Sequence, residues 1–291
     1  MQTTAAALTM VRDDAFYLKI WLRYYGEMLG RENCYIINHG RGEEVADLAA
    51  GCNVIGIPGD PNPRFEQNRW RLLSNTLAGL LGYYRHVIVS DVDEIVVVDP
   101  ANGGNLLQWL EKRRRLRVYT PLGLDMFQRL DLECDEITDQ VLGPRLHAKI
   151  ALPYSKPCVL GKEARFARGG HYSTFEKLNA PSELYLLHLK FVDYAEYVKT
   201  LDRRNAMVQD IGLEARETTI GRHWYASDRG DDRAPFEEFA NYKMEKEFDL
   251  DWVRDAMRES WKRRGETSFW QFDRPKYKTQ VRLPDRFAGL F

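Results

Sequence analysis

The chain has 291 residues, of which 44% are hydrophobic and 29% are charged, a composition typical of a globular protein with a full core. Because 42 Lys and Arg residues face 43 Asp and Glu residues, the sequence excludes a general nucleic-acid binder, which needs a basic surplus. The four cysteines form no CxxC pair and no zinc-type spacing, which favours a reducing compartment. No signal peptide or membrane span is evident, and we expect a cytoplasmic protein without a transmembrane segment.

The first part of the chain alternates between short apolar runs and helical patterns. The apolar runs predict three strands, at residues 5–11, 34–39 and 54–57. Apolar residues that recur at intervals of three and four predict helices at residues 15–25, 43–50 and 64–84. Strands that alternate with helices are typical of a parallel sheet with crossover helices, so the sequence predicts an α/β fold.

Residues 87–98 form a β-branched run that three carboxylates interrupt. The run predicts a buried strand. A buried strand has no reason to carry Asp91, Asp93 and Glu94 unless something compensates them, because an unpaired buried charge is very unfavourable. We therefore expect the strand to end near Ser90 and to present the carboxylates at its carboxyl end, where open α/β sheets bind ligands.

Asp91 and Asp93 are two residues apart, so in an extended chain their side chains point to the same side. Two hard oxygen ligands on one side suit Mg²⁺ or Mn²⁺ that carries the phosphates of a nucleotide. A surface turn with solvated acids is the alternative, since Asp-x-Asp is a common triplet. The apolar flanks favour the metal interpretation.

Several motifs resemble the opening of family-2-like glycosyltransferases. They are residues 9–14 (TMVRDD), the Leu and Trp helix pattern at 18–30, residues 35–40 (YIINHG) and residues 89–94 (VSDVDE), the last of which resembles the metal-binding Asp-x-Asp with its trailing glutamate. The similarity covers the first hundred residues well and is looser to about residue 200. It implies a GT-A fold, a Rossmann-like and mostly parallel central sheet flanked by helices that binds a nucleotide-sugar with a divalent cation. The sequence departs from the family pattern at Asp14, where glutamate is usual, and at residues 40–42, where a serine and an aspartate are usual.

The resemblance also implies residues for each part of the site. Asp91 and Asp93 would hold Mn²⁺ or Mg²⁺, and His171 or His188 resembles the further histidine ligand that such folds add from their later half. The nucleotide-sugar would contact Val11, Arg12, Asp13, Asn38, Gln67, Asn68, Arg71 and Asp91. Lys156 and Lys190 are the candidates to meet the diphosphate charge. Plain alternatives exist, because a lone histidine in an apolar strand is usually a core residue and a lysine is usually solvated.

An inverting sugar transfer needs a carboxylate base within hydrogen-bond reach of the acceptor hydroxyl. Asp125, Asp135 and Glu136 are the candidates, and Asp125 is the first choice because it follows an apparent strand at residues 117–122. Each of them has the alternative of being a surface acid or a helix cap. A transfer that retains configuration needs no such base.

The predicted organisation is a glycosyltransferase domain over residues 1–210, divided at about residue 100 into a nucleotide-sugar half and an acceptor half, followed by a polar loop and a helical, partly irregular extension over 211–291. The polar residues 212–235 would either close over the donor or form a plain surface loop. Residues 250–263 have the pattern of an amphipathic helix. The tail at 269–291 mixes aromatic and basic residues, and it would dock on the domain, contact a membrane surface or bind a subunit.

The sequence therefore predicts a metal-dependent glycosyltransferase with a UDP- or GDP-sugar donor and a saccharide or lipid-linked acceptor, in bacterial-type polysaccharide or glycoconjugate synthesis. It would act in the cytoplasm, with peripheral contact to the inner face of the membrane as an option. One alternative is a sugar nucleotidyltransferase, which should carry a Gly- and Lys-rich phosphate loop that residues 11–14 lack. The other is a non-catalytic nucleotide-sugar-binding module.

Overall fold

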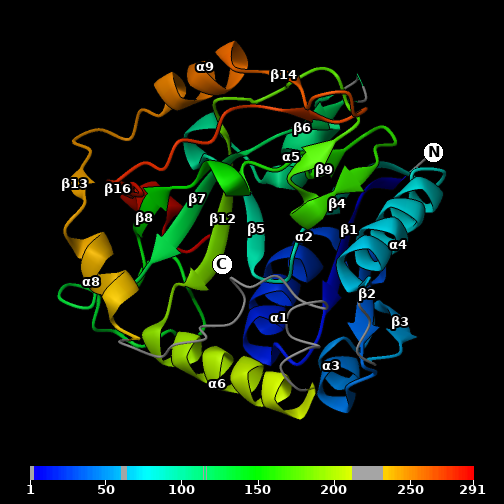
Figure 1. Ribbon diagram of the computed structural model, residues 1–291, viewed down its shortest axis with the longest axis horizontal. Helices are drawn as coiled ribbons and strands as arrows, with labels where there is room; N and C mark the ends of the chain where they lie inside the picture. The colour runs from blue at the N-terminus through cyan, green and yellow to red at the C-terminus, as the bar shows by residue number, and fades with distance from the viewer. Residues whose placement is uncertain (1–2, 60–63, 114, 116, 212–231) are drawn as a thin grey trace.

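The computed structural model describes residues 3–59, 64–113, 115, 117–211 and 232–291. It is a mixed α/β structure with three sheets and flanking helices (Figure 1), so the predicted α/β class is confirmed at that level. Most of the polar segment predicted to close over the donor, residues 212–231, lies outside the described residues.

The N-terminal sheet has the strand order β3-β2-β1-β4-β9-β6. Its strands are β1 (Thr3–Val11), β2 (Cys34–His39), β3 (Asn53–Ile57), β4 (Tyr84–Val89), β6 (Val118–Tyr119) and β9 (Val159–Leu160). Strands β1 to β4 are parallel, and β9 is antiparallel to β4 and to β6. Since the chain proceeds from β1 to β2 and β3 and then returns to β4 on the other side of β1, the strand order reverses between β1 and β4. The carboxyl ends of these two strands are therefore a topological switch point, where open α/β sheets bind ligands.

Helices cover both faces of this sheet. Successive side chains of β1 point to opposite faces, so each face presents apolar side chains to the helices that pack on it. Leu8 packs with Leu73 of α4 (Phe65–Leu80) on one face. Ala7 packs on the other face, in the core that contains Leu18 of α1 (Ala15–Trp21) and Leu110 of α5 (Leu106–Glu111). The other helical segments of this half are the π-helical turn η1 (Leu22–Gly26), α2 (Glu27–Leu29), the 3₁₀ turn η2 (Arg31–Asn33), α3 (Glu43–Leu48) and the 3₁₀ turn η3 (Pro100–Asn102).

The predicted strand at 87–98 is in fact two strands that belong to different sheets. Strand β4 ends at Val89, and β5 (Glu94–Val98) begins five residues later in the second sheet. A turn closed by a hydrogen bond from the Glu94 N–H to the Asp91 carbonyl, 3.0 Å long, joins them. The expectation that the first strand ends near Ser90 is confirmed, and the turn carries the carboxylates from one sheet to the next.

The second sheet has the order β13-β16-β8-β7-β12-β5. Its other strands are β7 (Leu122–Phe127), β8 (His147–Ile150), β12 (Leu184–Phe191), β13 (Lys243–Met244) and β16 (Thr279–Arg282). Strand β12 lies between β5 and β7, antiparallel to β5 and parallel to β7, with His188 opposite Glu94 on one side and Asp125 on the other. One row across three strands therefore contains an imidazole and two carboxylates.

The C-terminal residues contribute to the sheets as well as forming helices. Helices α6 (Tyr194–Ile211), α8 (Ala234–Ala240) and α9 (Asp251–Glu259) are present, and α9 confirms the amphipathic helix predicted at 250–263 in a shorter form. A small antiparallel sheet has the order β10-β11-β15-β14, from β10 (Phe166–Ala167), β11 (Tyr172–Ser173), β14 (Lys262–Arg263) and β15 (Trp270–Gln271). The 3₁₀ turns η4 (Leu152–Tyr154), η5 (Arg168–Gly170) and η7 (Asp285–Phe287) complete the described elements.

Strand β16 pairs with β8, and β15 pairs with β11, so the C-terminal residues share two sheets with the preceding part of the chain (Figure 1). The predicted helical extension is therefore incomplete, because strands of two to four residues have no periodicity that a sequence reveals. Among the helices that the structure describes, none combines the length and the apolar character needed to cross a membrane.

Candidate functional site

The candidate site is the turn between β4 and β5, at the carboxyl ends of β1 and β4. The Ser90 N–H donates to the Leu8 carbonyl of β1, and the Trp21 indole donates to the Ser90 hydroxyl at 3.4 Å. These contacts fix the turn against the sheet and against α1. Asp91 and Asp93 follow directly, with 23% and 18% of their side chains exposed.

Two buried cations hold Asp91. Arg69 donates to Oδ1 of Asp91, and the Lys156 ammonium donates to Oδ2 at 3.0 Å and to Oε1 of Glu94 at 2.5 Å. Burial opposes the charge on Asp91, but Arg69 and Lys156 outweigh it and hold the pKa of Asp91 well below its usual range. Burial likewise opposes the charge on Lys156, but Asp91 and Glu94 outweigh it and raise the pKa of the ammonium. Lys156 is therefore a fully charged, buried lysine.

His188 lies between two other carboxylates. Its Nδ1 is 2.6 Å from Oδ1 of Asp125, its Nε2 is 3.3 Å from Oδ2 of Asp93, and the Tyr154 ring stacks on it with centroids 3.7 Å apart. Burial lowers the pKa of His188, but Asp93 and Asp125 outweigh it and raise the pKa to about 9. The imidazole is therefore protonated near neutral pH. Lys149 adds a second cation, 3.4 Å from Oδ2 of Asp125.

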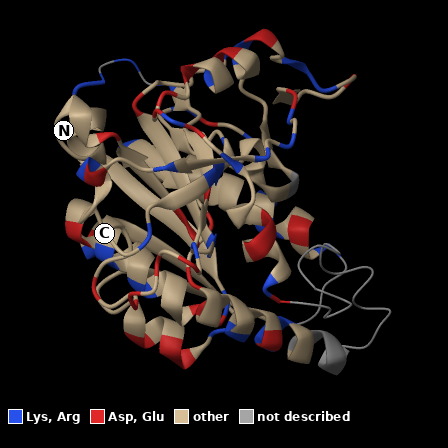
Figure 2. Ribbon diagram, turned by 90° about the vertical axis from the view of Figure 1, so that its left-hand side faces the viewer, with Lys and Arg blue, Asp and Glu red and all other residues tan. Residues whose placement is uncertain are grey.

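These side chains form what we call the paired-charge network: the carboxylates Asp91, Asp93, Glu94 and Asp125 with the cations Arg69, Lys149, Lys156 and His188. In Figure 2, acidic and basic segments lie side by side among the strands in the middle of the molecule. The sequence predicts that the negative charges of these buried carboxylates are balanced by other groups. The structure shows that cations of the chain itself balance them.

A divalent cation does not fit the network as it is arranged. Within the described residues, no group of three or more His, Cys, Asp or Glu side chains is placed to hold a metal ion. Both oxygens of Asp91 face protein cations, and Oδ2 of Asp93 faces Nε2 of His188. The requirement for Mn²⁺ or Mg²⁺ therefore stays a prediction.

His171, the other predicted histidine ligand, lies in a turn that needs glycine. Gly170 has φ +69°, and a Cβ there would lie 2.5 Å from the Trp70 ring. Burial lowers the pKa of His171 to about 3, and the positive charges of Lys156 and Arg274 act in the same direction. His171 is therefore neutral, and its Nδ1 has no hydrogen-bond partner among the described atoms. Its role as a ligand stays a prediction.

The residues predicted for the nucleotide at the ends of β1 and β2 come together. Val11 is paired with Asn38 in the sheet register. The side-chain amide of Asn38 accepts from the Gly42 N–H at 3.0 Å and donates to the Gly42 carbonyl at 2.9 Å, so it holds the turn after β2. Arg12 donates to the Gly59 carbonyl at 3.0 Å, and Asp13 has a left-handed φ of +54°. These residues surround the carboxyl end of β1.

The helix α4 contributes a residue that the sequence prediction missed. Gln67 and Arg71 are exposed, and Arg71 donates to the side chain of Asn68 at 3.2 Å rather than to the network. The helical residue that contacts Asp91 is Arg69. The sequence spacing could have indicated Arg69. It lies four residues before Leu73 on the apolar stripe of the helix, where an arginine needs a buried partner.

The two predicted catalytic carboxylates differ in position. Asp125 lies inside β7 rather than after a strand, so that part of the prediction is wrong: the predicted strand at 117–122 is interrupted at residues 120–121, and a new strand begins at Leu122. Its side chain is 5% exposed, and although burial opposes its charge, His188 and Lys149 hold its pKa below the usual range. Asp135 is exposed on the loop after β7, and its backbone carbonyl accepts from Arg145. The carboxylate of Asp135 is not part of the network, and its catalytic role stays a prediction.

Comparison with models of known protein families and with curated proteins finds no match.

Proposed function

We propose that the protein is a GT-A-type glycosyltransferase that moves a sugar from a nucleoside-diphosphate sugar to a hydroxyl of a saccharide or lipid-linked acceptor. The observation that carries this proposal is the position of the Asp91–Asp93 turn. It lies at the carboxyl ends of β1 and β4, where the strand order reverses, and the residues suggested for the nucleotide lie around the neighbouring end of β1.

In this proposal Asp91 and Asp93 are the carboxylates that a bound donor meets first, because they are several times more exposed than Asp125. Arg69 and Lys156 fix the orientation of Asp91 and supply positive charge at the strand end. Such charge favours the diphosphate as the bond to the sugar breaks and negative charge accumulates on the leaving oxygen.

If the transfer inverts configuration, a carboxylate must take the proton of the acceptor hydroxyl while that oxygen attacks the anomeric carbon. The Asp93–His188–Asp125 row supplies ionised carboxylates for this step, because His188 keeps both of them ionised at neutral pH.

A nucleotide-binding panel tests the proposal. The melting temperature is measured with UDP, GDP and their sugars, each with EDTA or with Mn²⁺. The wild type should be stabilised by one nucleotide class, and transfer or slow hydrolysis of the corresponding sugar should follow. Asp91→Asn should lose most of the turnover, whereas Asp139→Asn, a change of an almost fully exposed carboxylate, should keep it. The pair of EDTA and Mn²⁺ samples decides whether a divalent cation is required.

Three results would contradict the proposal in different ways. If no nucleotide raises the melting temperature, the proposed nucleotide site does not exist. Release of pyrophosphate from a nucleoside triphosphate and a sugar phosphate would indicate a nucleotidyltransferase. Nucleotide binding without turnover of any donor, unchanged in Asp91→Asn, would indicate a non-catalytic binding module.

A further inference from the structure

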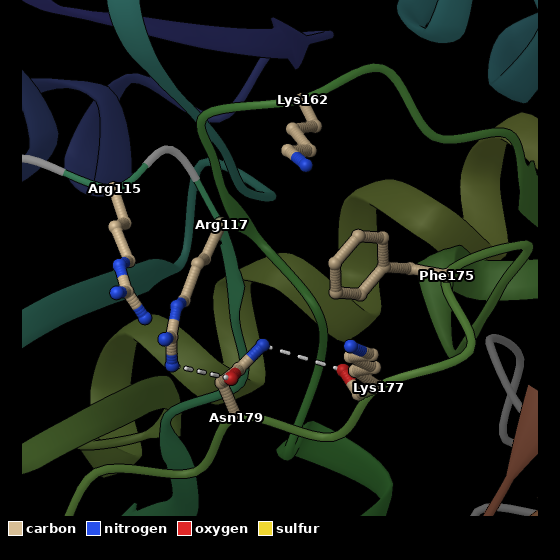
Figure 3. A pocket seen from close by; sticks show the side chains of 6 residues that line it. All are labelled: Arg115, Arg117, Lys162, Phe175, Lys177 and Asn179. Atoms are coloured by element: carbon tan, nitrogen blue, oxygen red, sulfur yellow. Dashed lines mark hydrogen bonds between the residues drawn. The ribbon is translucent and has the colours of Figure 1, made fainter.

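A second concave site lies away from the network. It is a pocket of about 510 Å³ whose lining we call the cationic pocket: Arg115, Arg117, Lys162, Phe175, Lys177 and Asn179 (Figure 3). Four of the six lining side chains are cations, and the lining contains no carboxylate. This volume is within the range of small-molecule sites.

The topology separates this pocket from the candidate site. Arg117 precedes β6 and Lys162 follows β9, and the Gly161 N–H donates to the Arg117 carbonyl at 2.7 Å. Because β9 is antiparallel to both β4 and β6, these two positions lie toward the amino end of β4. Asp91 follows the opposite, carboxyl end of that strand. The cationic pocket is therefore not part of the site proposed for sugar transfer.

Asn179 joins the segments that form the pocket by hydrogen bonds. Its amide donates to the Val118 carbonyl at 2.9 Å and to the Lys177 carbonyl at 3.4 Å, and its Oδ1 accepts from the Arg117 guanidinium at 3.3 Å. The Thr120 N–H donates to the Asn179 carbonyl at 2.8 Å. The segment that carries Lys177 is thereby fixed to β6, and Figure 3 shows side chains from both segments around one space.

Within the part of the chain that the structure describes, no carboxylate pairs with the cations of the pocket. Glu183 is half-buried and is already bound by Arg113 at 2.7 Å and by the Trp109 indole at 2.8 Å. Among the described residues, Arg115, Lys162 and Lys177 form no ion pair. In a chain of net charge −1, four cations around one pocket are a local excess rather than a reflection of composition.

We propose that the cationic pocket binds a ligand that carries phosphate groups. Two arginines offer planar pairs of donors that match phosphate oxygens, and two lysines add point charges. The half-buried Phe175 ring supplies one apolar wall for the carbon part of such a ligand. The phosphate can belong to a soluble phosphate ester or to a lipid headgroup at a membrane surface. This site is independent of the proposed sugar transfer.

The test uses inorganic pyrophosphate and a matched pair of double variants. Lys162→Gln/Lys177→Gln changes the pocket, and Lys246→Gln/Lys276→Gln makes the same chemical change at two other exposed lysines. Isothermal titration should show binding to the wild type that weakens as salt rises. The pocket variant should lose at least about tenfold in affinity, equivalent to about 1.4 kcal/mol, and the control variant should bind like the wild type. If the candidate site also binds pyrophosphate, only one of two binding steps should disappear.

Vesicle flotation distinguishes the two sources of phosphate. Vesicles of phosphatidylcholine with phosphatidic acid should carry the wild type but not the pocket variant if the ligand is a headgroup, whereas vesicles without phosphatidic acid should carry neither. Binding of pyrophosphate without vesicle binding assigns a soluble ester. The proposal is overturned if the wild type binds neither probe, or if the pocket variant binds as well as the control variant. The pocket variant should retain the nucleotide response of the candidate site, so failure of one proposal is distinguishable from failure of the other.

Discussion

The paired-charge network and the cationic pocket contain the same kinds of basic side chain in opposite circumstances. Arg69 and Lys156 expose 7% and 6% of their side chains, and both contact carboxylates. Lys162 and Lys177 of the pocket are exposed, and neither forms an ion pair with a described residue. The difference shows that burial, rather than residue type, creates the need for a counter-charge, because water solvates an exposed ammonium and cannot reach a buried one. The exposed set is therefore available to an external anion without first giving up a carboxylate of the chain.

The largest expected effect concerns a buried cation of the paired-charge network. Lys156→Met removes the cation shared by Asp91 and Glu94 and leaves both carboxylates buried without it, so the free energy of unfolding should fall by about 3–5 kcal/mol. The matched change Lys162→Met in the cationic pocket should alter it by less than about 0.5 kcal/mol. Urea denaturation of both variants measures the difference. Equal effects of the two changes would show that the network does not depend on Lys156.

A second experiment sharpens the comparison with a buried group that has no counter-charge. His86 in β4 is fully buried, and burial, together with the positive charge of Arg85, lowers its pKa from 6.5 to about 4. Because the folded pKa lies below the unfolded one, the contribution of His86 to stability is present above pH 6.5 and is lost as the pH falls toward 4. The loss is at most about 3 kcal/mol.

His86→Phe should remove this part of the acid sensitivity, so that the free energy of unfolding falls less between pH 7 and pH 4.5 than it does in the wild type. Some pH dependence should remain, because the pKa values of His39 and His171 are lowered in the same way. An unchanged dependence would mean that His86 titrates equally in the folded and unfolded chains.

The smallest expected effect concerns the exposed lysines of the cationic pocket. Lys162→Gln/Lys177→Gln should leave the free energy of unfolding within about 0.5 kcal/mol of the wild type, or raise it slightly by relieving repulsion between like charges. Any such gain should disappear at high salt, because salt screens exposed charges. Thermal melts at low and high salt measure it. A large loss of stability would show that these lysines are structural and would remove the contrast between the two regions.

Much of the framework was predictable because it rests on local patterns. The strand Cys34–His39 was predicted with its observed bounds, and the end of β4 near Ser90 followed from the placement of three acids in an apolar run. Helix α4 was predicted as longer than it is, since Tyr84 continues the apolar pattern although it begins the next strand. Such patterns locate elements well and their ends less well.

The partners within the site were not predictable from spacing. His188 faces Asp125 only because β12 lies beside β7, and it reaches Asp93 only because the turn after β4 enters the sheet of β12. The residues involved are separated by more than sixty positions along the chain. The periodicity of residues within one segment does not indicate which strands become neighbours in a mixed sheet.

The sequence by itself determined that the acids after β4 must be neutralised, because apolar flanks bury them and burial does not tolerate isolated charge. Only the tertiary structure decided what neutralises them. Strand order and helix packing brought Arg69, Lys156 and His188 to those oxygens, and they left the lysines of the cationic pocket facing solvent. The physical reason is that the need for a counter-charge arises from local burial, whereas its identity depends on contacts between segments distant in the chain.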